Sequence, residues 1–403
     1  MAEAAILGFG TVGSGVYEII KNSDFSGVVG DDLNVKYILD IRDFNNDEIK
    51  PLLTKDFNDI LNDDEVSVVC EVMGGLHPAY EFTKQLLQKG VSVATSNKEL
   101  VATYGAELLE IARANNASYM FEASVGGGIP IIRPMTICTK ANIIERIAGI
   151  LNGTTNYILN EMLEKGKSFD EALSDAQEKG YAERNPAADI EGHDACRTLA
   201  ILSSMAWGKC VDYNEIPTEG IVNITAEDVS YAKALNCAIK LIGYAELDED
   251  NKIYARVSPM MVSQKVPLSS VDGVFNAVML KGNYLGDAMF YGRGAGKEAT
   301  ASAVVADMLD CARHLDTKKH NIVWELDNEN IMANADEKVL SFFIRCSDTI
   351  ENIEKQFDDV TYIKLDNMND EVAFTIKNIQ QKKLDAGLGA LNNVISCIRL
   401  LEE

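Results

Sequence analysis

The residue types best suited to chemistry gather in one polar stretch in the middle of the chain, from Gly180 to Leu199. Its first fifteen residues contain five side chains that carry a formal charge at pH 7: Glu183, Arg184, Asp189, Glu191 and Asp194. Asn185-Pro186 favours a turn, and the apolar residues from Leu199 onward predict a helix. Carboxylates on a loop ahead of a rigid helix suit a small polar substrate that carries an amine. The alternative is a solvated acidic connector, because charged loops usually face water.

A second pattern with chemical meaning lies near the N-terminus. It is a G-x-G-x-x-G sequence made of Gly8, Phe9, Gly10, Thr11, Val12 and Gly13. The apolar run Ala4–Leu7 before it predicts a buried strand, and Val16, Ile19 and Ile20 after it have helical spacing. Glycines between a strand and a helix let the backbone approach a pyrophosphate at the helix N-terminus. The pattern therefore predicts a dinucleotide-binding site.

The next apolar run, Val35–Ile41, includes an acidic residue near its end. Asp40 could accept a hydrogen bond from a ribose 2′-hydroxyl and so select NAD. Arg42 could instead pair with a 2′-phosphate and select NADP, or it could be a solvated loop residue. The preference between NAD and NADP stays open at this level.

Two further strands are predicted at Val66–Met73 and Gly90–Ala94, each followed by polar or glycine-rich residues. In an open parallel sheet, ligands bind at the carboxyl ends of the strands. Met73, Gly74, Ser96 and Lys98 come at these ends, so we predict that they line the cofactor site. The alternative for Lys98 is a surface lysine that opens a helix.

The loop Glu122–Pro130 contains three consecutive glycines and a proline, which exclude regular structure and expose carbonyl oxygens. Such a loop either binds a hard cation through oxygen atoms or forms a hinge between domains. Farther on, the polar turn Asn152–Asn156, which includes Thr154, opens a predicted helix and is suited to hold a carboxylate. A simple N-cap is the alternative for this turn.

The remaining patterns predict an α/β protein with three parts. Residues 1–130 form a Rossmann-type parallel-sheet domain, onto which residues 291–325 return. Residues 131–290 form an α+β catalytic and dimerisation domain. Residues 336–403 follow a βαββαβ order, which is the ferredoxin-like arrangement.

Composition excludes several classes of function. The net charge of −25 argues against binding to nucleic acid or to an anionic membrane, because both need a basic surface. No segment resembles a signal peptide or a membrane span. The eight cysteines are scattered singly and only four histidines are present, so a zinc site is not expected. We expect a cytoplasmic protein with reduced thiols.

Taken together, these motifs resemble homoserine dehydrogenase over nearly the whole chain. The Gly180–Asp194 block resembles that family's own signature, and further matches follow the family's order: Gly8–Gly13, Ser96–Lys98, Glu122–Pro130, Asn152–Asn156, Val271–Val278 and Tyr291–Ser302. The last module looks like the ACT-type regulatory domain that many bacterial members carry. The resemblance implies NAD- or NADP-dependent interconversion of L-homoserine and L-aspartate 4-semialdehyde, in the biosynthesis of threonine and methionine.

The resemblance also assigns roles to residues. Glu183 and Asp194 would hold the amine and hydroxyl ends of the substrate, with Thr154 nearby and Lys98 beside the reacting centre. Gly180 and Gly294 would contact the cofactor. The loop would bind a monovalent cation, Na⁺ or K⁺, through four positions: Glu122, Val125, Gly127 and Ile129. The family also suggests a homodimer or homotetramer.

One position departs from the family pattern. The signature ends in a lysine, taken as the proton donor to the substrate oxygen, and this chain has Thr198 there. Hydride transfer to an aldehyde leaves an alkoxide that needs an acid, and a threonine hydroxyl is a poor acid at neutral pH. Arg197 points about 100° away on a helix, so Lys98 is the matched cation that remains. We therefore expect near-normal binding with reduced turnover, and the alternative is a ligand-sensing homologue with little catalysis.

A smaller departure lies in the last module. Its first predicted strand is followed by Cys346-Ser347-Asp348-Thr349 rather than the usual Asp-x-Pro-Gly turn. This change does not favour threonine feedback through the module.

Overall fold

A computed structural model describes residues 2–23, 25, 33–315, 317, 322–325, 331–366, 368 and 370–402. The chain divides into two compact units. Unit 1 consists of residues 1–144, 200–214 and 281–330, and unit 2 of residues 145–199, 215–280 and 331–403. The three-domain division stays a prediction. In the described part of the chain, no helix has the length and apolar character needed to cross a membrane.

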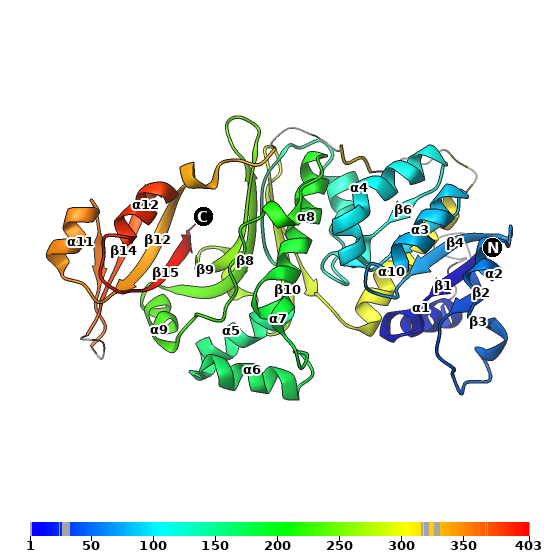
Figure 1. The fold of residues 1–403 in the computed structure, drawn as a ribbon, viewed down its shortest axis with the longest axis horizontal. Helices are drawn as coiled ribbons and strands as arrows, with labels where there is room; N and C mark the ends of the chain where they lie inside the picture. The colour runs from blue at the N-terminus through cyan, green and yellow to red at the C-terminus, as the bar shows by residue number, and fades with distance from the viewer. Residues whose placement is uncertain are drawn as a thin grey trace. The chain divides into compact units, whose positions relative to one another are not determined.

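Unit 1 contains a parallel sheet with the strand order β3-β2-β1-β4-β5-β6 (Figure 1). Its strands are β1 (Ala2–Leu7), β2 (Leu33–Leu39), β3 (Leu53–Thr54), β4 (Val66–Glu71), β5 (Ser92–Thr95) and β6 (Tyr119–Met120). The order reverses at β1, which has β2 on one side and β4 on the other. This is the Rossmann-type topology, so the predicted fold class is confirmed.

Helices cover this sheet. They are α1 (Thr11–Asn22), α2 (Phe57–Leu61), α3 (Ala79–Gln88), α4 (Lys98–Ala114) and α10 (Lys297–Arg313). Val16 and Ile20 of α1 share a buried core with Val304 and Met308 of α10 and with alternate residues of β1 and β4. α3 and α4 lie together in Figure 1. Lys98 is the first residue of α4.

The strands of unit 2 follow one another in the order β10-β7-β8-β9-β15-β12-β14-β13 within a larger mixed sheet. The strands outside its C-terminal part are β7 (Ile144–Ile150), β8 (Cys237–Leu247), β9 (Ile253–Ser263) and β10 (Phe275–Gly282). β8 and β9 pair antiparallel along their whole length, from Cys237 opposite Ser263 to Leu247 opposite Ile253. The accompanying helices are α5 (Gly153–Lys165), α6 (Phe169–Glu178), α7 (Ala187–Ile190), α9 (Ala226–Ala234) and the first part, residues 193–199, of α8 (His193–Trp207).

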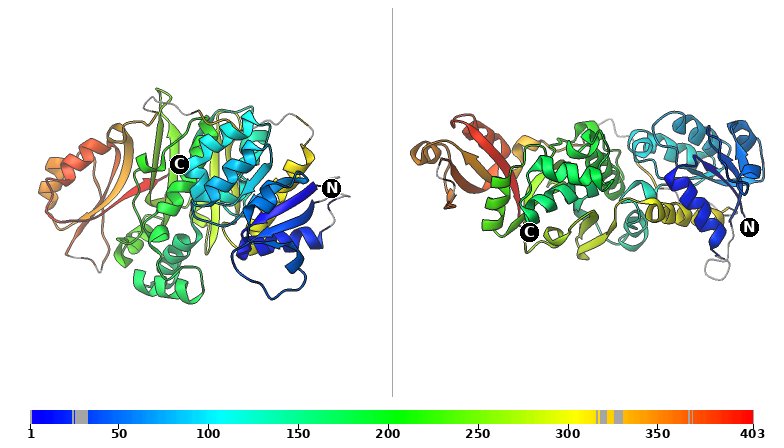
Figure 2. Two further views of the ribbon diagram at one scale, coloured as in Figure 1. Left: turned by 45° about the vertical axis from the view of Figure 1, so that its right-hand side comes forward. Right: turned by 90° about the horizontal axis from the view of Figure 1, so that it is seen from below.

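The C-terminal part of unit 2 has the predicted βαββαβ order. Its elements are β12 (Val339–Cys346), α11 (Ile350–Gln356), β13 (Thr361–Ile363), β14 (Val372–Gln380), α12 (Gln381–Leu388) and β15 (Val394–Leu401). Ile353 of α11 and Leu384 of α12 share one core with Phe342 and Phe374, so both helices cover the same face of the strands (Figure 2). β15 pairs in parallel with β9, with Arg399 opposite Met260.

One local expectation was wrong. The sequence placed the signature carboxylates on a loop, but Asp189 lies in α7 and Asp194 lies in the first turn of α8. Tyr291–Arg293 completes the strand β11 (Gly286–Arg293). The long strand β8 was not predicted.

Candidate active site

The dinucleotide motif folds as a tight turn between β1 and α1. Gly8 has φ +94°, and a Cβ atom on Gly13 would lie 2.0 Å from the carbonyl oxygen of Gly8. A Cβ atom on Gly8 would lie 2.9 Å from Cα of Met73, so the motif and the turn after β4 are in contact. Glycine is required at both positions, and the N-terminus of α1 follows directly. This geometry fits the pyrophosphate of a dinucleotide.

Asp40 follows β2 and is almost fully buried. Its Oδ2 accepts from the backbone N–H of Phe9 at 2.7 Å and from Arg42 Nη2 at 2.8 Å. Its Oδ1 accepts from Arg42 Nε at 2.9 Å and from Arg42 N at 3.0 Å. The hydrogen bonds from Arg42 hold the pKa of this carboxyl well below its usual range. Both oxygens are therefore engaged, while the Arg42 guanidinium stays exposed over the Phe44 ring.

The turns after β4 and β5 are joined by Asn97. Its Nδ2 donates to the carbonyl oxygen of Gly75 at 2.7 Å, and its Oδ1 accepts from the N–H of Leu100 at 3.1 Å. Asn97 thus caps α4, whose first residue is Lys98. The N–H of Ser96 donates to the carbonyl oxygen of Glu71 at 3.3 Å. Unit 1 therefore gathers the predicted residues Met73, Gly74, Ser96 and Lys98 at the carboxyl ends of neighbouring strands.

The loop of three glycines packs tightly against the turn before α10. Gly127 has φ +57°, and a Cβ atom on it would lie 2.4 Å from the carbonyl oxygen of Gly294. The N–H of Gly128 donates to the carbonyl oxygen of Arg293 at 3.2 Å. The loop is glycine-rich because a second piece of backbone passes against it. This places Gly294 beside the predicted cation loop.

Glu122, at the start of that loop, is buried, and its carboxylate accepts hydrogen bonds from three backbone N–H groups. Oε1 accepts from the N–H of Ile131 at 2.6 Å and of Ile132 at 2.7 Å, and Oε2 accepts from the N–H of Arg133 at 2.9 Å. Three backbone donors therefore engage the side chain of Glu122. Backbone carbonyls of the loop are further oxygen atoms suited to bind a cation.

In unit 2, Asn152 connects the polar turn to the signature. Its Oδ1 accepts from the N–H of Thr155 at 2.9 Å and caps α5. Its Nδ2 donates to Asp189 Oδ1 at 2.7 Å and to Asp194 Oδ2 at 3.0 Å. One buried amide thus brings two carboxylates together, next to the N-terminus of a helix. The sequence analysis named the turn but not this role of Asn152, whose signal was a capping residue in a polar cluster.

The segment after Gly180 is anchored to the same turn. Gly180 has φ +73°, and Thr154 Oγ1 donates to the carbonyl oxygen of Tyr181 at 2.7 Å. Gln177 Nε2 donates to the carbonyl oxygen of Glu183 at 3.1 Å. The side chain of Glu183 is exposed. Unit 2 therefore joins Thr154 to the Gly180–Glu183 segment, and Asn152 to Asp194.

The polar turn is braced from behind by a buried amine. Lys240 of β8 is 1% exposed, and its Nζ donates to Asn156 Oδ1 at 3.1 Å and to the carbonyl oxygen of Val271 at 2.5 Å. Asn156 Nδ2 also donates to the carbonyl oxygen of Val271, at 3.0 Å. Burial lowers the pKa of Lys240. These bonds fix the base of the turn that carries Thr154.

Thr198 lies one helical turn after Asp194 and is fully buried. Its Oγ1 donates to the carbonyl oxygen of Asp194 at 3.2 Å, so the hydroxyl is used within its own helix. A side chain in this state neither carries a positive charge nor offers an acidic proton to a ligand.

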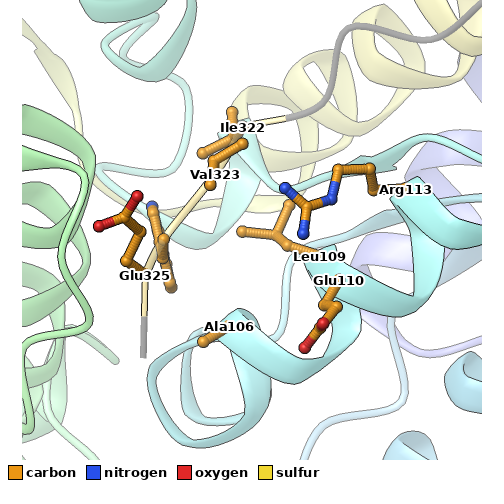
Figure 3. A pocket seen from close by; sticks show the side chains of 8 residues that line it. Ala106, Leu109, Glu110, Arg113, Ile322, Val323 and Glu325 are labelled. Carbon is orange, nitrogen blue, oxygen red and sulfur yellow. The ribbon is translucent and has the colours of Figure 1, made fainter. Parts of the chain in front are cut away.

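A cavity of about 440 Å³ in unit 1 is lined by other residues. It is lined by Ala106, Leu109, Glu110 and Arg113 of α4 and by residues 322–325. Figure 3 shows the side chains of Leu109 and Arg113 extending from α4 toward Val323. None of the predicted site residues lines this cavity, so we do not assign it to the reaction.

Two family models match this chain, one in its N-terminal part and one in its middle part. The homoserine dehydrogenase family model matches residues 130–309, and the model of the homoserine dehydrogenase NAD binding domain matches residues 8–122. The homoserine dehydrogenase of Synechocystis sp. is 41% identical over 312 residues, which cover 76% of this chain and 72% of that protein. The Bacillus subtilis enzyme is 40% identical over 316 residues, covering 77% of this chain and 72% of that enzyme.

Solved structures of homoserine dehydrogenases also resemble this chain. The homoserine dehydrogenase of Thiobacillus denitrificans superposes with a TM-score of 0.89 at 34% identity, over 100% of this chain and 98% of that one. The Staphylococcus aureus enzyme gives 0.82 at 32%, over 99% and 98%. A hyperthermophilic archaeal homoserine dehydrogenase in complex with NADPH gives 0.66 at 29%, over 79% and 99%. The chain therefore belongs to the homoserine dehydrogenase family and is an NAD(P)-dependent oxidoreductase.

Proposed function

We propose that this chain interconverts L-homoserine and L-aspartate 4-semialdehyde with slow turnover, because its signature lacks the proton-donating lysine. The observation that carries the proposal is Thr198, which is fully buried and hydrogen-bonded to the carbonyl oxygen of Asp194. Ligand-binding groups are otherwise present. The missing lysine should therefore slow the chemical step and leave the binding of substrate and cofactor almost unchanged.

The nicotinamide supplies or accepts the hydride when it is bound. Reduction of the aldehyde leaves negative charge on the substrate oxygen, and Lys98 is the group we assign to protonate it. Asp194 binds the hydroxyl end of homoserine and Glu183 binds its amine, while Thr154 orients the segment that carries Glu183. Asn152 supports this assignment because it holds Asp194 in place.

Nicotinamide absorbance at 340 nm with L-homoserine tests the proposal on the native chain and on Thr198→Lys. We expect the lysine to raise kcat by about 10²–10⁴-fold, with KM for homoserine little changed. Thr198→Met is the matched control, since it adds a long side chain without the amine, and it should stay slow. Equal rates in the native chain and Thr198→Lys would show that Lys98 or water suffices, and would contradict slow turnover.

A second candidate is a ligand-sensing homologue that binds cofactor and amino acid with little catalysis. Thr198 favours this candidate as well, because binding groups remain where the acid is missing. Calorimetric titration with NADPH and homoserine separates the two. Tight binding with no turnover in either the native chain or Thr198→Lys would support sensing.

For the cofactor, we assign a preference for NADP over NAD. Both carboxylate oxygens of Asp40 already accept hydrogen bonds, so a ribose 2′-hydroxyl would have to compete with Arg42. The Arg42 guanidinium is anchored, exposed and stacked over Phe44, which suits a 2′-phosphate.

For the cation loop, we assign a Na⁺ or K⁺ site at Glu122, Val125, Gly127 and Ile129, with backbone carbonyls as the main ligands. Three amide donors engage the Glu122 carboxylate, so the backbone carbonyl of Glu122 suits the cation better. Thermal unfolding in KCl, NaCl and choline chloride at equal ionic strength tests this. A Tm that responds to the alkali ions but not to choline is expected, and equal Tm values in all three salts would exclude the site.

We also propose that the chain forms a homodimer or homotetramer. Ile143, Tyr284 and Leu285 are exposed, and Asn142 Oδ1 accepts from the N–H groups of Tyr284 and Leu285 at 3.2 and 2.8 Å. Apolar side chains gathered at one exposed turn support an interface. Sedimentation of the native chain and of Tyr284→Lys tests it, and a monomeric native chain would contradict it.

We assign the βαββαβ module as an ACT-like regulatory domain. We propose that it does not respond to threonine at its first turn. Asp348 Oδ2 there accepts from the N–H of Asn392 at 2.6 Å and from Asn352 Nδ2 at 2.8 Å. The turn is thus bonded within its own module. Unchanged kcat and Tm in millimolar threonine are expected, and inhibition would contradict this assignment.

A further inference from the structure

A buried carboxylate of unit 1 has no part in the chemistry assigned above. Glu71 ends β4 and is completely buried. Its Oε1 accepts from the N–H of Met73 at 2.8 Å, and its Oε2 accepts from Thr95 Oγ1 at 2.7 Å. Met73 belongs to the turn after β4, and Thr95 is the last residue of β5. One carboxylate therefore ties together the turns that follow two neighbouring strands.

The bonds continue into α4 and close a ring. The N–H of Asn97 donates to Thr95 Oγ1 at 2.9 Å, and Asn97 Nδ2 donates to the carbonyl oxygen of Gly75 at 2.7 Å. The path runs from Glu71 through Thr95 and Asn97 to Gly75, and returns along the chain to Glu71. Asn97 also caps the helix that begins with Lys98. Lys98 and the Met73–Gly74 turn are thus held by the same ring.

The ring needs two acceptor atoms at residue 71. Thr95 Oγ1 accepts from Asn97, so its proton is directed at Glu71 Oε2. Met73 N–H is a donor as well. A carboxylate offers two acceptor atoms, whereas an amide of the same shape offers one and must turn its N–H₂ group toward either Thr95 Oγ1 or the N–H of Met73, both of which donate. Burial raises the pKa of Glu71, and an unmatched donor in such a place is costly.

We propose that Glu71 is a positioning residue for hydride and proton transfer, holding both the cofactor turn Met73–Gly74 and the first turn of α4 with Lys98. This inference rests on the role proposed for Lys98. Glu71 does not touch the reacting atoms. It acts by fixing two segments whose displacement by about 1 Å would cost about 10²-fold in rate.

The test compares Glu71→Gln with Ser92→Ala, in both the native and the Thr198→Lys chains. Ser92 is a buried matched control: its Oγ accepts from the N–H of Ser118 at 3.1 Å, at the other end of β5. Glu71→Gln should raise the Kd for NADPH, read by fluorescence, and lower kcat, each by about ten-fold. Ser92→Ala should change both by less than about two-fold at a similar loss of Tm.

A double mutant separates positioning from general destabilisation. If Glu71 acts on kcat through Lys98, Glu71→Gln should lower kcat by less than about two-fold when Lys98 is already alanine. A full ten-fold effect on kcat in both backgrounds, with the Kd for NADPH unchanged, would overturn the proposal. So would unchanged Kd and kcat in Glu71→Gln, or an equal loss in Ser92→Ala.

A second pair of variants covers the case in which Glu71→Gln does not fold. Thr95→Val keeps the shape but removes the hydroxyl, and Thr95→Ser keeps the hydroxyl. The valine should weaken NADPH binding and the serine should restore it, and equal binding by both would overturn the proposal. If neither the native nor the Thr198→Lys chain turns over homoserine, the proposed function fails, yet the NADPH Kd values still decide whether Glu71 positions the cofactor turn.

Discussion

Asn152 Nδ2 lies 3.0 Å from Asp194 Oδ2, so the residue that caps α5 is hydrogen-bonded to a carboxylate of α8. The same nitrogen is 2.7 Å from Asp189 Oδ1. The amide of Asn152 thus links a carboxylate of α7 to a carboxylate of α8. In the function proposed above, it holds Asp194 where the hydroxyl end of homoserine would bind.

Replacing Asn152 by serine should keep the cap of α5 but remove the bridging donor. We expect KM for homoserine to rise by about ten-fold or more, because a hydrogen bond to a charged group is lost. Steady-state kinetics and thermal unfolding measure the two effects separately. Ser168→Ala, which removes the cap of α6, is the control that should lower Tm and leave KM unchanged. A lower Tm in Asn152→Ser with normal KM would mean that the bridge is only structural.

Removing the guanidinium in Arg42→Ala should reverse the choice of cofactor. The loss of one charge-assisted bond predicts a fall in kcat/KM for NADPH of about 10–100-fold, with little change for NADH. Freed from Arg42, Asp40 can accept a ribose hydroxyl. Lys55→Ala removes an exposed cation that pairs with Asp43 and should affect both cofactors equally. An equal loss for both in Arg42→Ala would refute the assignment.

Asp307 predicts a pH-dependent stability. Burial raises its pKa to about 7, although Arg133 Nη2 donates to it at 2.5 Å and the N–H of Glu122 at 2.9 Å. Between about pH 4, the unfolded value, and pH 7, the folded state binds the extra proton. The native chain therefore loses stability as pH rises through this window. Asp307→Asn lacks that loss, so its Tm relative to native should rise up to about pH 7 and then level off.

Thermal unfolding from pH 4.5 to 8 measures this difference. Asp63→Asn is the control, because Lys36 lowers the pKa of that carboxyl to about 2 and it is ionised in both states over this range. Its Tm difference from native should stay constant with pH. A constant difference for Asp307→Asn as well would show that Asp307 does not titrate there.

The C-terminal module should depend on Arg345. This buried side chain donates to Asp228 at 2.7 Å through Nη1 and to Glu371 at 2.8 Å through Nη2. Arg345→Met leaves two carboxylates without their cation, which predicts a loss of about 3–5 kcal/mol in the free energy of unfolding. Lys355→Met, which breaks an exposed pair with Glu351, should lose far less. Urea unfolding measures the free energy of unfolding of both variants. Similar small losses in the two variants would contradict the prediction.

The sequence predicted those parts of the fold that depend on local pattern. The Gly8–Gly13 turn, the strands beside it and the C-terminal βαββαβ order follow from apolar runs and glycine spacing. β8 was missed because Lys240 and Gly243 interrupt its apolar run, and the burial of that lysine depends on Asn156 and Val271 far away in the chain. A lysine is expected to face solvent as long as the groups that bind it inside the protein are unknown.

The candidate site shows the same limit. Gly8, Met73 and Lys98 could be placed together because strand ends in a parallel sheet share an edge. The bonds from Asn152 to Asp189 and Asp194 could not, since they span 37 and 42 residues. Asp194 was placed on a loop because its neighbours are polar, yet it begins a helix whose apolar face appears only from Leu199.

The parallel pairing of β15 with β9 has a consequence for shortened versions of this protein. Arg399, Leu400 and Leu401 lie opposite Met260, Met261 and Val262, three buried apolar residues. A chain that ended before residue 336 would leave this stretch of β9 as an open strand edge with its N–H and C=O groups unsatisfied. Open apolar edges recruit further strands, so such a truncation should precipitate or form fibrils unless polar substitutions protect the edge.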